Sequence, residues 1–358
     1  MFIQGGPGIG KSAIPRQIFR QVAEDEGREF HEWSDLTLAQ KQEALDTPEK
    51  YWIFADMRTS QMDTMSLVGI PNMANTEMLE NIPYSWVVYF TNKDAHGCIF
   101  FDEINLAAPI VQSITYSAIH DRVISDRRIA DAVYIFAAGN RLQDKGNTFE
   151  MPLPLRDRFA ECEVELDADA WLEWATTTGI NPHLVSFIKW KPSNLYNVDK
   201  VKAEKPATPR GVERASRLLG DLDILDDKAH MLVSISCGES FATEFQAYSS
   251  IYQDIDWDTL YKDPSLVKAM RLDLQYVVSA GLADQFRKNL DDIKTLKILF
   301  DIADNLREDF SVFCYKMVSG VTGGNLRKIV IKAGREKTFA KYAKFLLDNV
   351  EEAAVVNV

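Results

Sequence analysis

Eight residues near the start of the chain, Gly5 to Ser12, follow the pattern G-x-x-x-x-G-K-[ST] without a gap. Glycines in such a loop let main-chain N–H groups wrap closely around a pyrophosphate, where a Cβ atom would block the approach. Lys11 can reach the β and γ phosphates, and the Ser12 hydroxyl can ligate Mg²⁺. The other positions of the loop are Gly6, Pro7, Gly8, Ile9 and Gly10. The motif therefore predicts a binding site for a nucleoside triphosphate.

An apolar stretch, residues 99–101, runs directly into two acids, Asp102 and Glu103. In a P-loop fold we expect such a strand to lie beside the strand that precedes the loop, so that its carboxyl end faces the nucleotide. Asp102 would then hold Mg²⁺ through water, and Glu103 would orient and polarise the attacking water. Paired acids also end strands for no catalytic reason, but the phosphate loop upstream favours the catalytic interpretation.

Four further residues carry groups that suit a γ-phosphate. Asn140 follows an apolar strand and Gly139, and its amide can bond the γ-phosphate or the attacking water. Arg156 and Arg158 offer the planar contact to phosphate oxygens that a transition-state arginine needs. Arg210 falls in the first turn of a predicted helix. The alternatives are a turn-forming asparagine and solvated surface arginines.

The elements that must position these residues alternate between apolar strands and helices in the first half of the chain. This pattern is typical of a parallel sheet sandwiched by helices, an α/β fold. A helix is expected to begin near Ser12, where its N-terminal dipole favours an anion. Another helix is predicted over 109–120 and a small hairpin over 123–130. The predicted strands cover residues 2–4, 52–55, 98–101, 133–137 and 162–166.

The second half of the chain reads as helical from about residue 167. Thr208 is the predicted N-cap of a helix whose first residue is Pro209. Amphipathic helical segments are predicted over 266–274 and 296–306, and the helical pattern continues from about residue 246 to the end.

Composition excludes some classes of protein. The 358 residues are 46% hydrophobic, and no run approaches ~18 consecutive apolar residues, so no membrane span is predicted. The four cysteines lack C-x-x-C spacing, which indicates free thiols in a cytoplasmic protein. A net charge of −13 argues against broad binding of nucleic acid, although a local basic channel stays open.

At this point the motifs resemble those of AAA+ ATPases, and more narrowly of the MoxR-type branch found in bacteria and phages. Residues 98–108 (CIFFDEINLAA) resemble its Walker B with the trailing Asn-x-Ala, and residues 58–71 resemble its segment after the second strand. Residues 151–159 resemble the run that carries the arginine finger, and 208–210 the sensor 2 motif. The likeness covers about residues 1–245.

The resemblance gives these residues roles in ATP hydrolysis: Walker A contains Gly10, Lys11 and Ser12, Walker B contains Asp102 and Glu103, and the sensors are Asn140 and Arg210. Arg158 becomes the finger that acts on the ATP of a neighbouring subunit, with Arg156 as the open alternative.

The resemblance also implies an architecture and an output. It implies an ATPase core over 1–166, a helical lid over 167–245 and a helical C-terminal extension over 246–358. A finger supplied in trans requires a head-to-tail ring, six-fold in most of the family. Relatives of this type are chaperone-like remodelling machines that act on proteins, often beside partners with a von Willebrand factor A domain. The expected location is the cytoplasm, or the host cytoplasm if the gene is carried by a phage.

Three other functions stay open from the sequence. A nucleic-acid motor or loader would share every ATPase motif. A small-molecule P-loop enzyme, such as a kinase, would work as a monomer and need no finger. A nucleotide-switched scaffold would bind ATP and assemble with little turnover, although the presence of Glu103 disfavours it.

Overall fold

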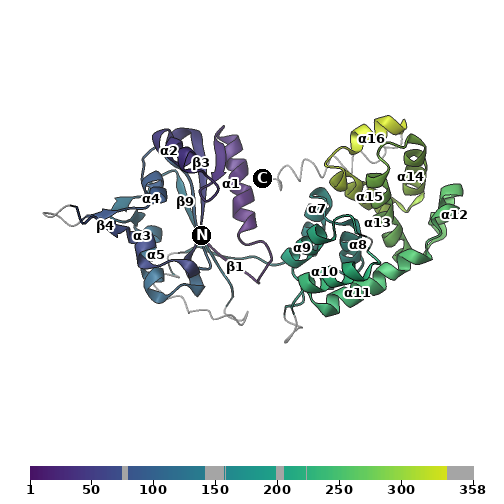
Figure 1. Cartoon of the computed structure of the whole chain (residues 1–358), viewed down its shortest axis with the longest axis horizontal. Helices are drawn as coiled ribbons and strands as arrows, with labels where there is room; N and C mark the ends of the chain where they lie inside the picture. Colours follow the sequence, from purple (N-terminus) through teal and green to yellow (C-terminus); the bar gives the residue numbers. More distant parts are fainter. Residues whose placement is uncertain (75–79, 142–156, 158, 199–204, 223, 337–358) are drawn as a thin grey trace. The chain divides into compact units, whose positions relative to one another are not determined.

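The computed structural model describes residues 1–74, 80–141, 157, 159–198, 205–222 and 224–336 (Figure 1). The chain forms two compact units, of which unit 1 contains Met1–Glu165 and unit 2 begins at Leu166. Unit 1 alternates strands and helices, whereas the described part of unit 2 is helical. Among the described residues, no helix combines the length and apolar character needed to cross a membrane.

Unit 1 is built on a six-stranded sheet with the order β10-β1-β9-β6-β3-β2, in which every neighbouring pair is parallel. Two antiparallel ribbons, β4–β5 and β7–β8, lie outside it. The strands of the sheet are β1 (Phe2–Gln4), β2 (Glu29–Glu32), β3 (Tyr51–Arg58), β6 (His96–Asp102), β9 (Val133–Gly139) and β10 (Glu161–Glu163). The ribbons consist of β4 (Ile70–Pro71), β5 (Asn81–Ile82), β7 (Val123–Ile124) and β8 (Arg127–Arg128).

Helices cover both faces of this sheet (Figure 1). Alternate residues of β6 point to opposite faces, so Cys98 and Phe100 pack with Phe19 of α1 (Ala13–Asp25), while Ile99 and Phe101 join the opposite core. That second core also contains residues of α2 (Leu38–Asp46), α3 (Thr64–Val68), α4 (Ser85–Phe90) and α5 (Pro109–His120). Strands β3 and β6 are buried on both sides over most of their length, as their near-continuous apolar sequences predict, whereas Tyr134 of β9 is exposed.

The predicted fold class, an α/β parallel sheet between helices with a phosphate loop after its first strand, is confirmed. The hairpin and the helix over 109–120 are confirmed as well. The predicted neighbour of the P-loop strand is wrong, because β9 lies between β1 and β6. Ala137 of β9 pairs with Phe2 on one side and with Phe101 on the other, so one strand separates the loop from the acids.

Unit 2 has one continuous hydrophobic core that runs from Trp171 to Ala333. Its helices are α7 (Ala168–Thr177), α8 (Pro182–Trp190), α9 (Pro209–Leu219), α10 (Asp227–Cys237), α11 (Glu239–Ser250), α12 (Trp257–Lys262), α13 (Leu272–Lys288), α14 (Ile293–Asn305), α15 (Glu308–Val321) and α16 (Leu326–Ala333). Helix α11 passes through residue 245, and helices on both sides of it share this core. The division into a lid and a C-terminal extension stays a prediction.

The predicted helical segment over 266–274 is wrong as one element. A 3₁₀ helix, η7 (Pro264–Ala269), ends before Met270, and α13 begins at Leu272. Met270 and Arg271 both have extended backbone, which breaks the helical path between two stretches that each carry apolar residues. The predicted continuation over 337–358 lies outside the described residues.

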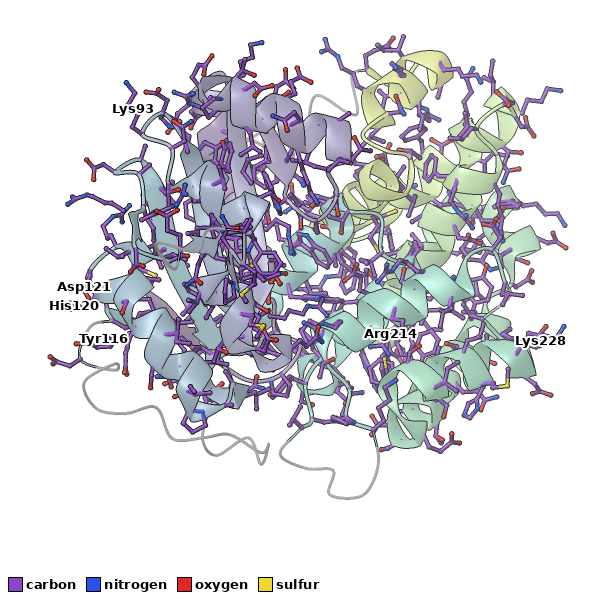
Figure 2. All side chains as sticks on the ribbon, turned by 60° about the vertical axis from the view of Figure 1, so that its left-hand side comes forward. Lys93, Tyr116, His120, Asp121, Arg214 and Lys228 are labelled. Atoms are coloured by element: carbon purple, nitrogen blue, oxygen red, sulfur yellow. The ribbon has the colours of Figure 1, made fainter. Side chains whose placement is uncertain are left out.

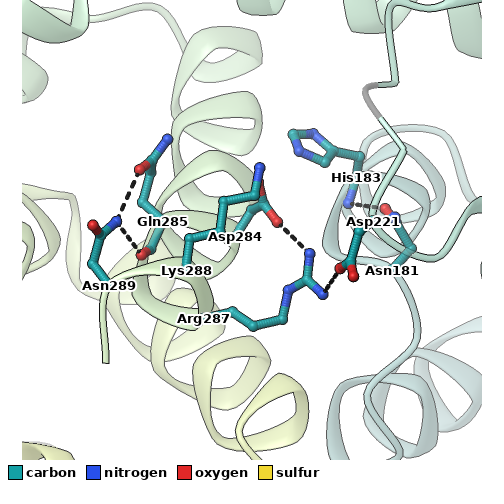
Figure 3. A network of polar contacts seen from close by, with 8 residues as sticks. All are labelled: Asn181, His183, Asp221, Asp284, Gln285, Arg287, Lys288 and Asn289. Carbon is teal, nitrogen blue, oxygen red and sulfur yellow. Dashed lines mark hydrogen bonds and ion pairs between the residues drawn. The ribbon is translucent and has the colours of Figure 1, made fainter. Parts of the chain in front are cut away.

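A polar network ties α13 to the segment after α9 within unit 2 (Figure 3). Arg287 donates to Asp221 and, at 2.9 Å, to Asp284, whose other oxygen lies 2.6 Å from the Lys288 ammonium. Burial alone would raise the pKa of Asp284, but the hydrogen bonds from Lys288 and Arg287 hold the pKa below its ordinary value. The carboxylate is thus stabilised in its charged form.

We expect Asp284→Asn to lower the free energy of unfolding at pH 7 by about 1–3 kcal/mol, because two cations lose a charged acceptor. Since the folded pKa is depressed, this stability is present above the unfolded pKa of about 3.9 and is lost as pH falls through the folded value. The gap between variant and parent should therefore narrow below about pH 4. Urea unfolding followed by circular dichroism at pH 7 and pH 3 measures it. Asp291→Asn, which removes an exposed partner of Lys332, is the control and should change little.

Candidate functional site

The phosphate loop connects β1 directly to α1 and has a backbone that requires glycine. Gly8 and Gly10 have φ of 75° and 104°, which an L side chain rarely adopts. A Cβ atom on Gly5 would lie 2.8 Å from the main-chain oxygen of Val164. The main-chain N–H groups of Ala13 and Ile14 both donate to Gly10, so the first turn of α1 begins at the loop. This places a helix N-terminus against any bound anion.

Lys11 lies at the centre of the loop with only 9% of its surface exposed. Its ammonium donates to the main-chain oxygens of Gly5 at 2.9 Å and Gly6 at 2.7 Å, and to Oδ1 of Asn140 at 2.9 Å. Asn140 directly follows β9, the strand that separates β1 from β6. The structure thus brings the loop lysine and the predicted sensor amide into direct contact.

The Ser12 hydroxyl donates to Oδ2 of Asp102 at 2.6 Å. Asp102 ends β6, and its other carboxylate oxygen accepts the main-chain N–H of Glu103 at 2.8 Å. A hydroxyl and a carboxylate are the hard oxygen ligands that Mg²⁺ uses beside phosphate oxygens and water, so this pair fits the cation. No cluster of three or more His, Cys, Asp and Glu residues suited to a metal occurs among the described residues, so the fit rests on this pair.

Glu103 lies in a turn that directs its carboxylate away from the carboxylate of Asp102. Its backbone is left-handed, with φ of 56° and ψ of 34°, which costs a non-glycine residue of the order of 1 kcal/mol. The Glu103 carboxylate accepts a hydrogen bond from Ser60, whereas Asp102 faces Ser12. Thr59, which is buried, donates to the main-chain oxygen of Asp102 at 2.7 Å. The two acids therefore serve different partners.

Sequence reasoning missed several residues of this site. Thr59 and Ser60 follow β3 and lie within the segment whose likeness to the family was noticed without any role for them. Asp56, also on β3, pairs with Arg16 of α1 at 3.0 Å. Burial, and then the nearby charge of Asp102, raise the pKa of Asp56 against the opposing effect of Arg16. A polar residue inside an otherwise apolar strand was the available signal.

The predicted arginines are placed differently. Arg210 is exposed in the first turn of α9 in unit 2, where the Thr208 hydroxyl caps the helix by accepting from the N–H of Gly211 at 3.1 Å. The predicted cap is therefore confirmed, while the role of Arg210 toward phosphate stays a prediction. Arg156 and Arg158 lie outside the described residues.

Polar side chains also gather away from this site. Figure 2 labels Tyr116, His120 and Asp121 at the end of α5, where the His120 ring lies 5.5 Å from that of Tyr116 and 3.8 Å from the Asp121 carboxylate. Both side chains of the His120–Asp121 pair are exposed and lie too far apart for a hydrogen bond, so this group lacks the fixed geometry seen around Lys11. The loop and the strand ends around Lys11 are consequently the best candidate site in unit 1.

Comparisons with known proteins give little beyond this geometry. No protein-family model and no curated protein matches the sequence. Among solved structures, NtrX from Brucella abortus in complex with ADP matches at 14% identity and a TM-score of 0.31, over 96% of this chain and 64% of its own. A mutant of RuvB from Thermotoga maritima matches at 16% identity and a TM-score of 0.25, over 93% and 74%. This chain spans less than two thirds of the NtrX chain, and such TM-scores decide neither fold nor function.

We expect Lys11→Ala to weaken ATP binding about 10- to 100-fold, because the loop loses a charge-assisted donor to the phosphates. Isothermal titration calorimetry with ATP and Mg²⁺ measures the change. Lys93→Ala, which removes an exposed lysine of unit 1 (Figure 2), is the matched control. Equal affinity in the Lys11 variant and its control would contradict the assignment of the loop.

Proposed function

We propose that the chain is an AAA+-type ATPase that hydrolyses ATP in the presence of Mg²⁺. The observation that carries this proposal is the convergence of Lys11, Ser12, Asp102, Glu103 and Asn140 at the carboxyl ends of three adjacent strands, β1, β9 and β6. Each of these residue types suits one task in phosphoryl transfer to water, and their hydrogen bonds already join the loop to the ends of β9 and β6.

Binding of the triphosphate falls to the loop. Its main-chain N–H groups and the N-terminus of α1 face the phosphates, and Lys11 exchanges its main-chain acceptors for phosphate oxygens. Ser12 and Asp102 are the residues that would hold Mg²⁺, which supplies charge neutralisation on the phosphates when bound. Because the Ser12–Asp102 contact is already made, little reorganisation of the protein is needed to bind.

Hydrolysis needs a water molecule held in line with the γ-phosphate. Glu103 is the group that orients this water and accepts its proton, and the Ser60 hydroxyl, which follows the neighbouring parallel strand β3, donates to the carboxylate and holds it in place. Asn140 bonds the γ-phosphate or the same water. Its contact with Lys11 keeps the amide at the position where charge develops in the transition state.

We expect Glu103→Gln to slow ATP turnover by about 100-fold while ATP binding is retained, because the variant keeps the shape of the side chain and loses the base. Phosphate release and calorimetric affinity, measured on the same preparation, separate the two effects. Glu24→Gln, at an exposed site near the end of α1, is the control. Unchanged turnover in the Glu103 variant would instead favour a nucleotide-switched scaffold.

The proposal also covers the oligomeric assembly and the macromolecule on which the ATPase acts. We place a helical lid over 167–245 with Arg210 as its sensor, and Arg158 as the finger that completes the site of a neighbouring subunit in a ring, six-fold in most relatives of this type. The MoxR-type likeness favours remodelling of a protein, with a partner that carries a von Willebrand factor A domain. The net charge of −13 disfavours nucleic acid as the substrate of remodelling.

We expect turnover to recover in part when Arg158→Ala and Lys11→Ala subunits are mixed, because an intact loop then meets an intact finger at some interfaces. Turnover of each variant alone gives the baseline, and native mass spectrometry verifies mixed rings. The same experiment with Arg156→Ala decides which arginine is the finger. Mixed rings without recovery for either arginine would exclude a shared site.

A further inference from the structure

Asn105 is a buried residue that the ATPase proposal leaves without a task. It lies in η3 (Ile104–Leu106), the 3₁₀ turn directly after Glu103, and only 4% of its surface is exposed. Its Nδ2 donates to the main-chain oxygen of Asn140 at 2.6 Å. Asn140 in turn accepts from the Lys11 ammonium through its side chain. One residue of the acidic turn is therefore bonded to the residue that contacts the phosphate lysine.

The acceptor of this bond lies where the sheet no longer supplies a donor. Pairing of β9 with β6 ends at Ala137 opposite Phe101, and pairing of β9 with β1 ends at Gly139 opposite Gln4. The oxygen of Asn140 is one residue beyond the last of these pairs. A side chain from the β6 turn thus continues the connection between the two strands after the ladder ends.

The contact also explains a glycine. Because a carbonyl can only accept, the NH₂ group of Asn105 must face Asn140, and its Oδ1 then faces Gly139. A Cβ atom on Gly139 would lie 2.6 Å from that Oδ1. Among the described residues, Oδ1 finds no hydrogen-bond donor, which costs stability. The buried Asn105 amide thus leaves its oxygen unpaired while its NH₂ group bonds the Asn140 carbonyl, which points to a role for that NH₂ group.

We infer that Asn105 is a positioning residue for ATP hydrolysis, an inference that rests on the proposed function. By holding the main chain at the end of β9, it keeps the Asn140 amide against Lys11 and the γ-phosphate. It touches neither nucleotide nor water and acts through Asn140 alone. Displacement of a positioned group by about 1 Å can cost 100-fold in rate, so the loss of this bond should appear in kcat.

The first test is Asn105→Asp, which keeps the size of the side chain and turns an oxygen toward the Asn140 carbonyl. We expect kcat for ATP to fall about 10- to 100-fold with a much smaller change in KM. Gln112→Glu is the matched control, because Gln112 is equally buried in α5 and donates to the main-chain oxygen of Ala107 at 3.1 Å. Its kcat per folded protein should stay within about twofold of the parent.

The second test is a double-mutant cycle with Asn105→Ala and Asn140→Ala. Each substitution removes the side-chain amide and introduces no additional bulk. If Asn105 acts through Asn140, the double variant has the kcat of Asn140→Ala alone within about twofold. Losses that multiply, or an Asn105→Asp variant with the parent's kcat, overturn the inference and leave the ATPase intact. If Glu103→Gln does not lower the ATP turnover of the parent protein, the proposed function and the inference are overturned together.

Discussion

The buried ammonium of Lys11 is the interaction on which the rest of the site depends. A cation with so little exposure is tolerated only when polar atoms surround it, and among the described residues the oxygens of Gly5, Gly6 and Asn140 do so. Two of them belong to the loop, whose glycines permit the carbonyls to turn inward, and the third comes from Asn140. The same charge therefore fixes the loop conformation and attaches it to the end of β9. Phosphate oxygens can replace these acceptors without leaving the lysine unpaired.

The position of β9 between β1 and β6 determines which contacts connect the phosphate loop to the acidic turn after β6. If the loop strand and the acidic strand were neighbours, the ladder itself would join β1 to β6. With β9 between them, two links among the described residues connect the loop to the acidic turn. One passes through Asn140 and the Asn105 side chain at the end of β9, and the other is the Ser12–Asp102 hydrogen bond. The strand order therefore places Asn140, the residue after β9, at the centre of the site. Its local sequence, an asparagine after a glycine, is also typical of an ordinary turn and does not predict this position.

The sequence predicts those parts of unit 1 whose signal is local. Glycine chemistry predicts the loop, continuous apolar runs predict the strands at 98–101 and 133–137, and a proline at the first helical position predicts the helix that begins at Pro109. Strand β2 was missed because its sequence, Glu-Phe-His-Glu, is polar and lies at the sheet edge. The order of strands and the contacts of Ser60 and Asn105 are long-range, and no pattern along one chain records which strand ends become neighbours.

Each unit has hydrophobic cores of its own, and this limits how the proposed ATPase can convert hydrolysis into movement. The core of unit 2 is continuous from α7 to α16, and the two cores of unit 1 lie on the faces of its sheet. Close-packed interiors resist gradual deformation, so a change at the phosphates is transmitted more cheaply by moving a whole unit than by reshaping one. Helix α9 packs into the core of unit 2 through Val212, Ala215 and Leu219, and the Thr208 cap fixes its first turn, so Arg210 is carried by that unit as a rigid part of it.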